Sequence, residues 1–88
     1  MNNQAALDKL NAAAADARKV KNSRLYNALT AAASTIAQYM YYENSGADMS
    51  EARFPTAADV FKSELNPDNE PSADQVAALT MALEALNA

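Results

Sequence analysis

An uncharged run of eighteen residues constrains this chain more than any other feature. Residues 25–42 (LYNALTAAASTIAQYMYY) contain no Asp, Glu, Lys or Arg and place three tyrosines among the last four positions. As a helix the run is about 27 Å long. An uncharged helix is normally buried around most of its circumference. The run therefore predicts a central helix that other elements, or other molecules, cover.

The chain supplies few large apolar side chains for that purpose. Hydrophobic residues make up 50% of its 88 residues, but 22 of them are alanine and only 14 are Leu, Ile, Val or Phe. Alanine favours helix and buries little apolar area. We expect one domain over residues 1–88, with a thin core that neighbouring subunits or another partner complete.

Apolar spacing predicts helices on both sides of Asn22 and Ser23. From residue 3 to about 21 the apolar positions step by four and three: Ala6, Leu10, Ala13, Ala17 and Val20. The uncharged run repeats the pattern one residue out of phase: Leu25, Leu29, Ala32, Ile36 and Tyr39 or Met40. The phase change indicates either a turn between two helices or one long helix over about 3–44 with a stutter. Gly46 suits the left-handed position that ends such a helix.

Two later helices begin with recognisable caps. Thr56 with Asp59, and Ser72 with Gln75, match or approximate the capping box and each follows a proline. They predict helices over about 57–65 and 73–87. The second presents the cleanest apolar stripe in the chain: Val76, Leu79, Leu83 and Leu86. Because no segment alternates as a strand does, we expect an all-α bundle of three to four helices.

The residue content argues against catalysis and metal binding. There is no histidine and no cysteine, so neither an activated serine nor a thiolate nucleophile is available. Asp68, Glu70 and Asp74 are the best acidic group for a hard cation, but they lack the spacing of a calcium-binding loop. We expect no enzyme, no metal site and no cofactor.

Charge is divided unevenly along the chain. Residues 1–42 carry a net charge of +3 and residues 43–88 a net charge of −7. Four cations in the first half form a candidate electrostatic contact: Arg18, Lys19, Lys21 and Arg24. Four charges in a chain of pI near 4.5 are a weak footprint for nucleic acid. We expect them to meet acidic groups, in the same chain or in a neighbour.

A protein interface is the best-supported site in the uncharged run. Tyr39 and Tyr41 point in directions about 200° apart on a helix, so they cannot both face one core. Tyrosine is common at interfaces as a stiff anchor with a polar tip. The candidate interface residues are Tyr26, Tyr39, Tyr41, Tyr42, Leu29 and Ile36. The polar residues of the run and its few large aliphatics argue against a membrane span.

These features predict a protein that works by binding protein. The first interpretation is a small structural or assembly subunit, as in a virion or another homo-oligomer. The alternative is a small acidic inhibitor or adaptor that occupies the basic groove of a nucleic-acid-binding protein. The first residues lack the basic and apolar regions of a secretory signal, so a cytoplasmic product, free or incorporated into an assembly, is expected.

Overall fold

The computed structural model describes residues 3–44 and 56–87, and both ranges are helical. Four α-helices follow one another, with a short 3₁₀ helix before the last: α1 (Asn3–Lys19), α2 (Ser23–Asn44), α3 (Ala57–Glu64), η1 (Pro67–Asn69) and α4 (Ala73–Leu86). The predicted all-α fold is confirmed. Gly46, expected to end the second helix, lies outside the described residues.

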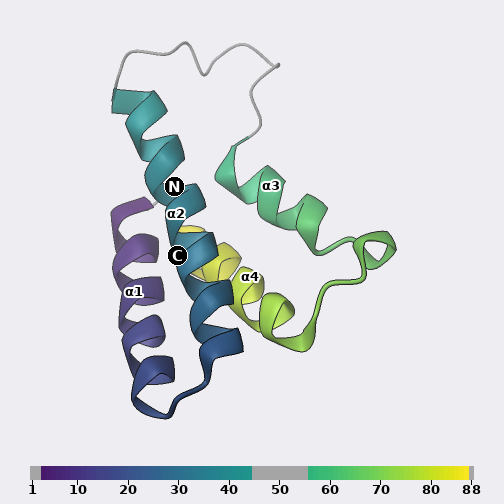
Figure 1. Ribbon diagram of the computed structural model, residues 1–88. Coiled ribbons are helices and arrows are strands. Elements are labelled where there is room, and N and C mark those ends of the chain that lie inside the picture. The colour runs from purple at the N-terminus through teal and green to yellow at the C-terminus, as the bar shows by residue number, and fades with distance from the viewer. Residues whose placement is uncertain (1–2, 45–55, 88) are drawn as a thin grey trace.

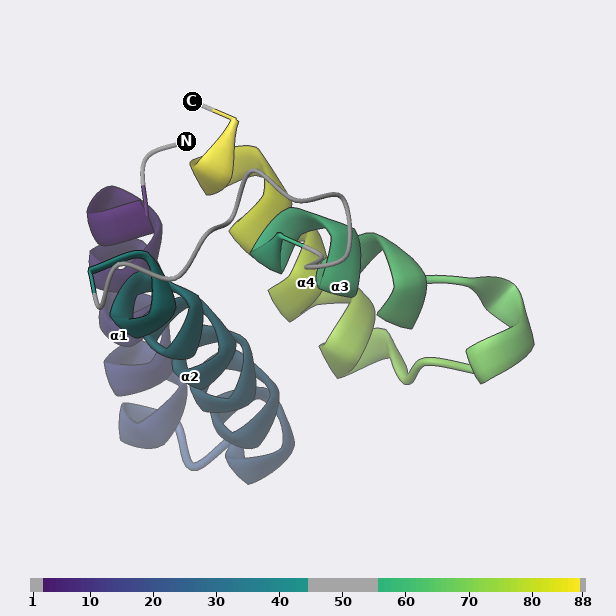
Figure 2. The same ribbon diagram turned by 90° about the horizontal axis from the view of Figure 1, so that it is seen from above.

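The helices form a hairpin with a second pair packed on one side. α1 and α2 run antiparallel and side by side (Figure 1). Seen from above, α4 lies against this hairpin and α3 lies along the outer side of α4 (Figure 2). α2 and α4 each contact all three of the other α-helices. The uncharged helix is therefore central, as its composition predicts.

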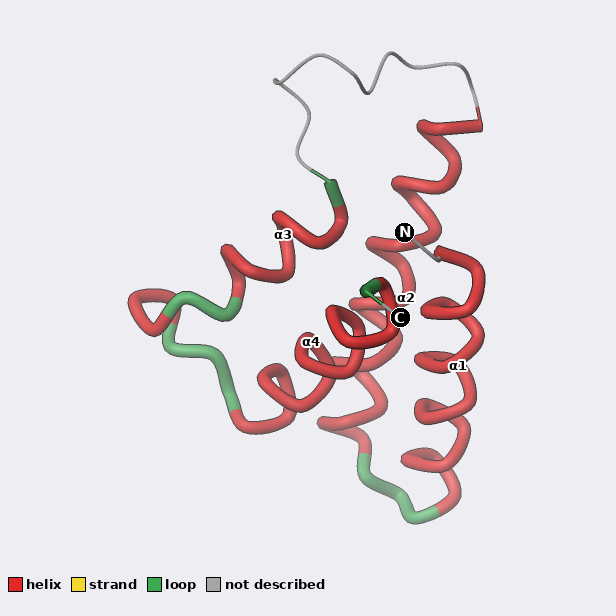
Figure 3. The backbone as a smooth tube through the Cα atoms, turned by 180° about the vertical axis from the view of Figure 1, so that it is seen from behind, coloured by secondary structure: helices red, strands yellow, loops and turns green. Residues whose placement is uncertain are grey.

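The alternative of one long helix over 3–44 is wrong. The chain reverses between Lys19 and Ser23, in the loop that joins the two neighbouring helices (Figure 3). A continuous helix of that length would extend for about 60 Å and leave its apolar stripes uncovered. Reversal instead buries the stripe of α1 against that of α2, and this gain decides between the two alternatives.

The core is built mostly from alanine. Ten of the sixteen buried hydrophobic residues are alanines, and five large side chains fill the centre. Those five come from all four helices: Leu10, Leu29, Ile36, Phe61 and Leu86. Small side chains let helices approach closely, but each contact removes little apolar area from water. The prediction of a thin core is thus confirmed in the described residues.

Two predicted apolar stripes each have one exposed member in the structure. Val20, the last member of the α1 stripe, is 74% exposed because the helix has already ended at Lys19. Val76 of α4 is 40% exposed, whereas the alanines at positions 78, 82 and 85 are buried. α4 lies against the hairpin and α3 at once, and the smallest side chains permit that approach. The buried face of α4 therefore consists of these alanines together with Leu79 and Leu86.

Both predicted capping boxes are present. At α3 the backbone N–H of Asp59 donates to Thr56 Oγ1 at 3.2 Å, and the N–H of Thr56 donates to Asp59 Oδ2 at 3.1 Å. At α4 the N–H of Gln75 donates to Ser72 Oγ at 3.2 Å, and the N–H of Ser72 donates to Gln75 Oε1 at 2.8 Å. Each box satisfies two backbone donors that the helix itself leaves unpaired.

The connection between α3 and α4 is held by its own hydrogen bonds. Asn66 precedes Pro67 in a non-helical conformation, and its side chain accepts from the N–H of Asp68 at 3.0 Å. Asn69 Nδ2 donates to the carbonyl of Ser63 at 2.7 Å. The end of α3 near Pro67 was predicted, because a residue before proline avoids the helical region. The 3₁₀ turn η1 was not.

Candidate protein-interaction surface

The turn between α1 and α2 brings the basic residues to one end of the hairpin. The N–H of Asn22 donates to the carbonyl of Ala17 at 2.9 Å, and the N–H of Lys21 donates to that of Arg18 at 3.1 Å. This pair of bonds is the Schellman arrangement, which needs a left-handed residue just after the helix. Lys21 takes that position with φ 59°. Glycine usually takes this position, and its absence left the sequence unable to choose between a turn and a continuous helix.

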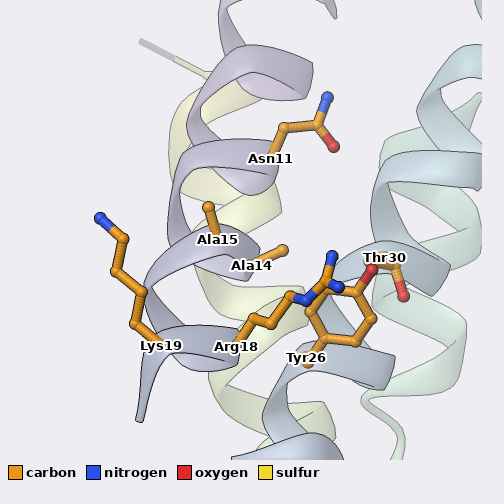
Figure 4. Close-up of a pocket in the computed structure, with 7 residues that line it drawn as sticks. All are labelled: Asn11, Ala14, Ala15, Arg18, Lys19, Tyr26 and Thr30. Atoms are coloured by element: carbon orange, nitrogen blue, oxygen red, sulfur yellow. The ribbon is translucent and has the colours of Figure 1, made fainter. Parts of the chain in front are cut away.

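Arg18 and Tyr26 are walls of two neighbouring surface hollows. One hollow of about 500 Å³ is completed by Lys21 and Ser23, and we call it the basic hollow. The second, of about 480 Å³, runs up the groove between α1 and α2 (Figure 4). In that view Arg18 extends from α1 toward the ring of Tyr26 on α2, whereas Lys19 points away from it. The half-buried ring of Tyr26 thus gives the basic hollow an apolar surface beside the cations Arg18 and Lys21.

The positive charge of the basic hollow is not neutralised in the described part of the chain. Among residues 3–44 and 56–87 the ion pair present is Lys19 with Asp16, at 4.0 Å, and both side chains are about 80% exposed. Such exposed pairs contribute little to stability. No ion pair to Arg18 or Lys21 is present there.

Arg24 lies apart from the other three cations. It faces a separate hollow of about 490 Å³ between α2 and the first turn of α4, and Asp74 lines the same hollow. The spacing of Arg18, Lys21 and Arg24 on one continuous helix would place them within one arc. The break after α1 separates them instead. In the structure Arg18 and Lys21 line one hollow together with Tyr26. Arg24 lines a different hollow together with Asp74.

The candidate interface residues separate into buried and accessible groups. Leu29 and Ile36 are 1% and 0% exposed, so they belong to the core of the chain itself. Tyr26 and Tyr39 are half-buried against that core, whereas Tyr41 is 69% exposed. The tyrosines do not form one cluster, since Tyr26 and Tyr39 lie about 20 Å apart along α2.

The last of these tyrosines, Tyr42, belongs to α2, and its side chain lies outside the described part of the structure.

One face of α2 is solvent-exposed, and we call it the open face. It consists of exposed residues that step by four and three: Asn27, Ala31, Ser34, Gln38 and Tyr41. None of them is charged. Sequence reasoning selected the large apolar residues of α2 and missed this complementary set. The signal that finds it is the same spacing, started from Asn27 instead of Leu25.

The acidic counterpart lies between α3 and α4. Glu64, Asp68 and Glu70 are all exposed, and we call this segment the acidic loop. It projects from the bundle well away from the α1–α2 turn (Figures 1 and 2). The described residues contain no group of three acidic side chains close enough to hold a metal ion. Asp68, Glu70 and Asp74 are therefore not gathered around one point.

Comparison with models of protein families, with curated proteins and with solved structures finds no match for this chain. Among the helices that the structure describes, none combines the length and the apolar character needed to cross a membrane.

Proposed function

We propose that this chain is a non-enzymatic structural or assembly subunit that associates with copies of itself, as in a virion or another homo-oligomer. The open face of α2 carries the proposal. Exposed helix faces are usually charged, yet this one is uncharged over about 21 Å from Asn27 to Tyr41. Covering these five residues buries no charged side chain among them, and burying charge is the main penalty for a polar surface.

The composition of the open face also suits a partner helix. Ala31 and Ser34 leave room for close approach, and Tyr41 supplies a large exposed ring at the end. Tyrosine is enriched where interfaces concentrate their binding energy. The alanine-rich core adds a second reason, because a small domain with little buried area gains stability from association.

The non-enzymatic part of the proposal rests on chemistry. The sequence contains no histidine and no cysteine, which are the commonest general base and a frequent nucleophile. The hollows described above are open and are lined mostly by exposed or half-buried side chains. Such surfaces do not exclude water from a reacting group as an active site does.

Mass in solution tests the proposal. Sedimentation velocity over a range of concentrations is expected to give species heavier than the 9.4 kDa chain. Ser34→Lys places a charge at the centre of the open face and is expected to shift the mass toward 9.4 kDa without loss of helical circular dichroism. Thr80→Lys, on the exposed side of α4, is the matched control and should leave the mass unchanged. A monomer at every concentration rules the assembly function out.

The acidic loop favours the second candidate, an inhibitor that occupies a basic groove. Glu64, Asp68 and Glu70 project without ion pairs to other described residues. The test measures displacement of labelled DNA or RNA from a panel of purified nucleic-acid-binding proteins. Displacement by the wild type that is lost in Asp68→Asn with Glu70→Gln supports this candidate. Displacement from none of them removes it.

A further inference from the structure

Two oppositely charged surfaces of this chain are placed where they cannot reach each other. The basic hollow lies at the α1–α2 turn, and the acidic loop lies at the far side of α3 and α4. The separation is plain from the front, from above and from behind (Figures 1, 2 and 3). Because exposed charges interact over about 8 Å at physiological salt, neither surface neutralises the other within one molecule.

One of the two surfaces is concave and the other projects. The basic hollow is a concave space of about 500 Å³, whereas the acidic loop is a projection. Hydrogen bonds hold that projection in one form: the N–H of Asn69 donates to Asn66 at 2.9 Å, and the N–H of Glu70 donates to Pro67 at 3.0 Å. A projection that is already ordered loses little conformational freedom when it docks. Exposed Pro67 gives it an apolar edge for the ring of Tyr26.

We propose that the basic hollow of one copy receives the acidic loop of a second copy. Arg18 and Lys21 then face Asp68 and Glu70, and Tyr26 lies under the prolines of the loop. The contact uses two different surfaces, so each bound copy still offers one free hollow and one free loop. Such head-to-tail contacts extend into a row or close into a ring. The inference rests on the proposed function, since both need more than one copy, but it uses surfaces away from the open face.

The test isolates this contact by working in the Ser34→Lys background, which blocks the open face. The parent protein is expected to gain mass with concentration at about 20 mM salt and to lose that gain at about 0.5 M salt. One variant adds Arg18→Gln and Lys21→Asn, and another adds Asp68→Asn and Glu70→Gln. Each is expected to self-associate at least about tenfold more weakly, because each lacks the charges of one partner surface.

Mixing the two neutralised variants gives the decisive result. Each retains one intact surface, so the pair is expected to form a 1:1 dimer that cannot grow further. Lys62→Gln with Glu84→Gln removes exposed charges outside both surfaces and should leave association unchanged. If the wild type assembles but the neutralised variants associate like their parent, the head-to-tail contact is overturned and the assembly function survives. If the wild type is a monomer at all concentrations and salts, both fail.

A separate DNA-binding measurement tests another use of the basic hollow. A labelled DNA shift that disappears with Arg18→Gln and Lys21→Asn, while self-association stays unchanged, would assign the hollow to nucleic acid and overturn the inference.

Discussion

The backbone N–H of Asn22 donates to the carbonyl oxygen of Ala17 at 2.9 Å, and this bond closes the turn that folds α2 back along α1. Between these two residues Lys21 is held at φ 59°. A side chain with a Cβ carries a steric cost of about 1–2 kcal/mol in that conformation. The same turn brings Arg18 and Tyr26 to one surface. The backbone conformation that forms the basic hollow therefore lowers the stability of the chain.

Replacing Lys21 with glycine is expected to stabilise the fold. Gly adopts a positive φ without steric cost, although it also loses more freedom on folding. The expected net gain in the free energy of unfolding is about 0.5–1 kcal/mol, measured by urea denaturation of a dilute sample. Because the same change removes a cation from the basic hollow, it should weaken self-association while it strengthens the fold.

The matched control is Lys62→Gly in α3. Lys62 is also exposed, but it lies inside a helix. Glycine there should lower the free energy of unfolding by about 1 kcal/mol. Equal effects at the two positions would contradict the role assigned to the left-handed Lys21.

Truncating Ile36 is expected to remove much of the stability of this small core. Its side chain is 0% exposed on the central helix. Ile36→Ala should cost about 3 kcal/mol, from lost apolar burial and the cavity left behind. Val20→Ala is the comparison, since Val20 is 74% exposed, and its effect should stay within about 0.5 kcal/mol. Thermal unfolding at one protein concentration compares them, and similar losses at the two positions would refute the burial of Ile36.

Enlarging an alanine of α4 tests whether the alanines of this helix belong to its buried face. Ala82 is 0% exposed, so Ala82→Leu should cost about 1–3 kcal/mol because the close helix contact has no room for it. Ala77→Leu makes the same change at an exposed position of α4 and should stay within about 0.5 kcal/mol. If Val76 belonged to the buried face, Val76→Ala would instead be the damaging change.

The fold is predictable from the sequence where large side chains or caps carry the signal. The predicted apolar stripe of α2 is buried in the structure, because Leu29 and Ile36 are large and regularly spaced. The predicted starts of α3 and α4 are confirmed, because a capping box is a local arrangement of side chain and backbone. On α4 the prediction is correct for Leu79 and Leu86, which are buried, and wrong for Val76. Alanine gives almost no contrast between faces, so the packing of several helices decides which alanines are buried.

The candidate site is less predictable than the fold. Arg18 and Lys21 were selected from their charge, but the hollow depends on a turn whose only local mark is a lysine in a glycine position. Without that turn, Arg24 groups with them and Tyr26 does not. Leu29 and Ile36 were selected as interface residues because a large apolar side chain suits a core and an interface equally well. Only the tertiary arrangement separates the two.

The capping box of α3 is expected to make that helix sensitive to acid. The Thr56 backbone N–H and, secondarily, its hydroxyl hydrogen-bond the Asp59 carboxylate and hold its pKa below the ordinary 3.8, against a small opposing effect of burial. A pKa lowered in the folded state means that the carboxylate stabilises the fold above its unfolded pKa. That contribution is lost as pH falls through the lowered value. Below about pH 4 the start of α3 should therefore loosen first.

Comparison of the two capped helices checks this expectation. The box of α4 uses Ser72 and Gln75, which carry no titrating group, so its backbone protection should persist where that of α3 falls. NMR is suited to the measurement, following the Asp59 carboxyl shift together with amide hydrogen exchange at the first turns of α3 and α4.

Asp59→Asn keeps an acceptor oxygen but removes the titration, so it should flatten the pH dependence of α3. Thr56→Ala should cost about 1 kcal/mol above pH 5 and less in acid, because protonation of Asp59 has then already weakened the hydrogen bonds that its carboxylate accepts from Thr56. Parallel loss of protection at both helix starts would show that acid acts elsewhere than on Asp59.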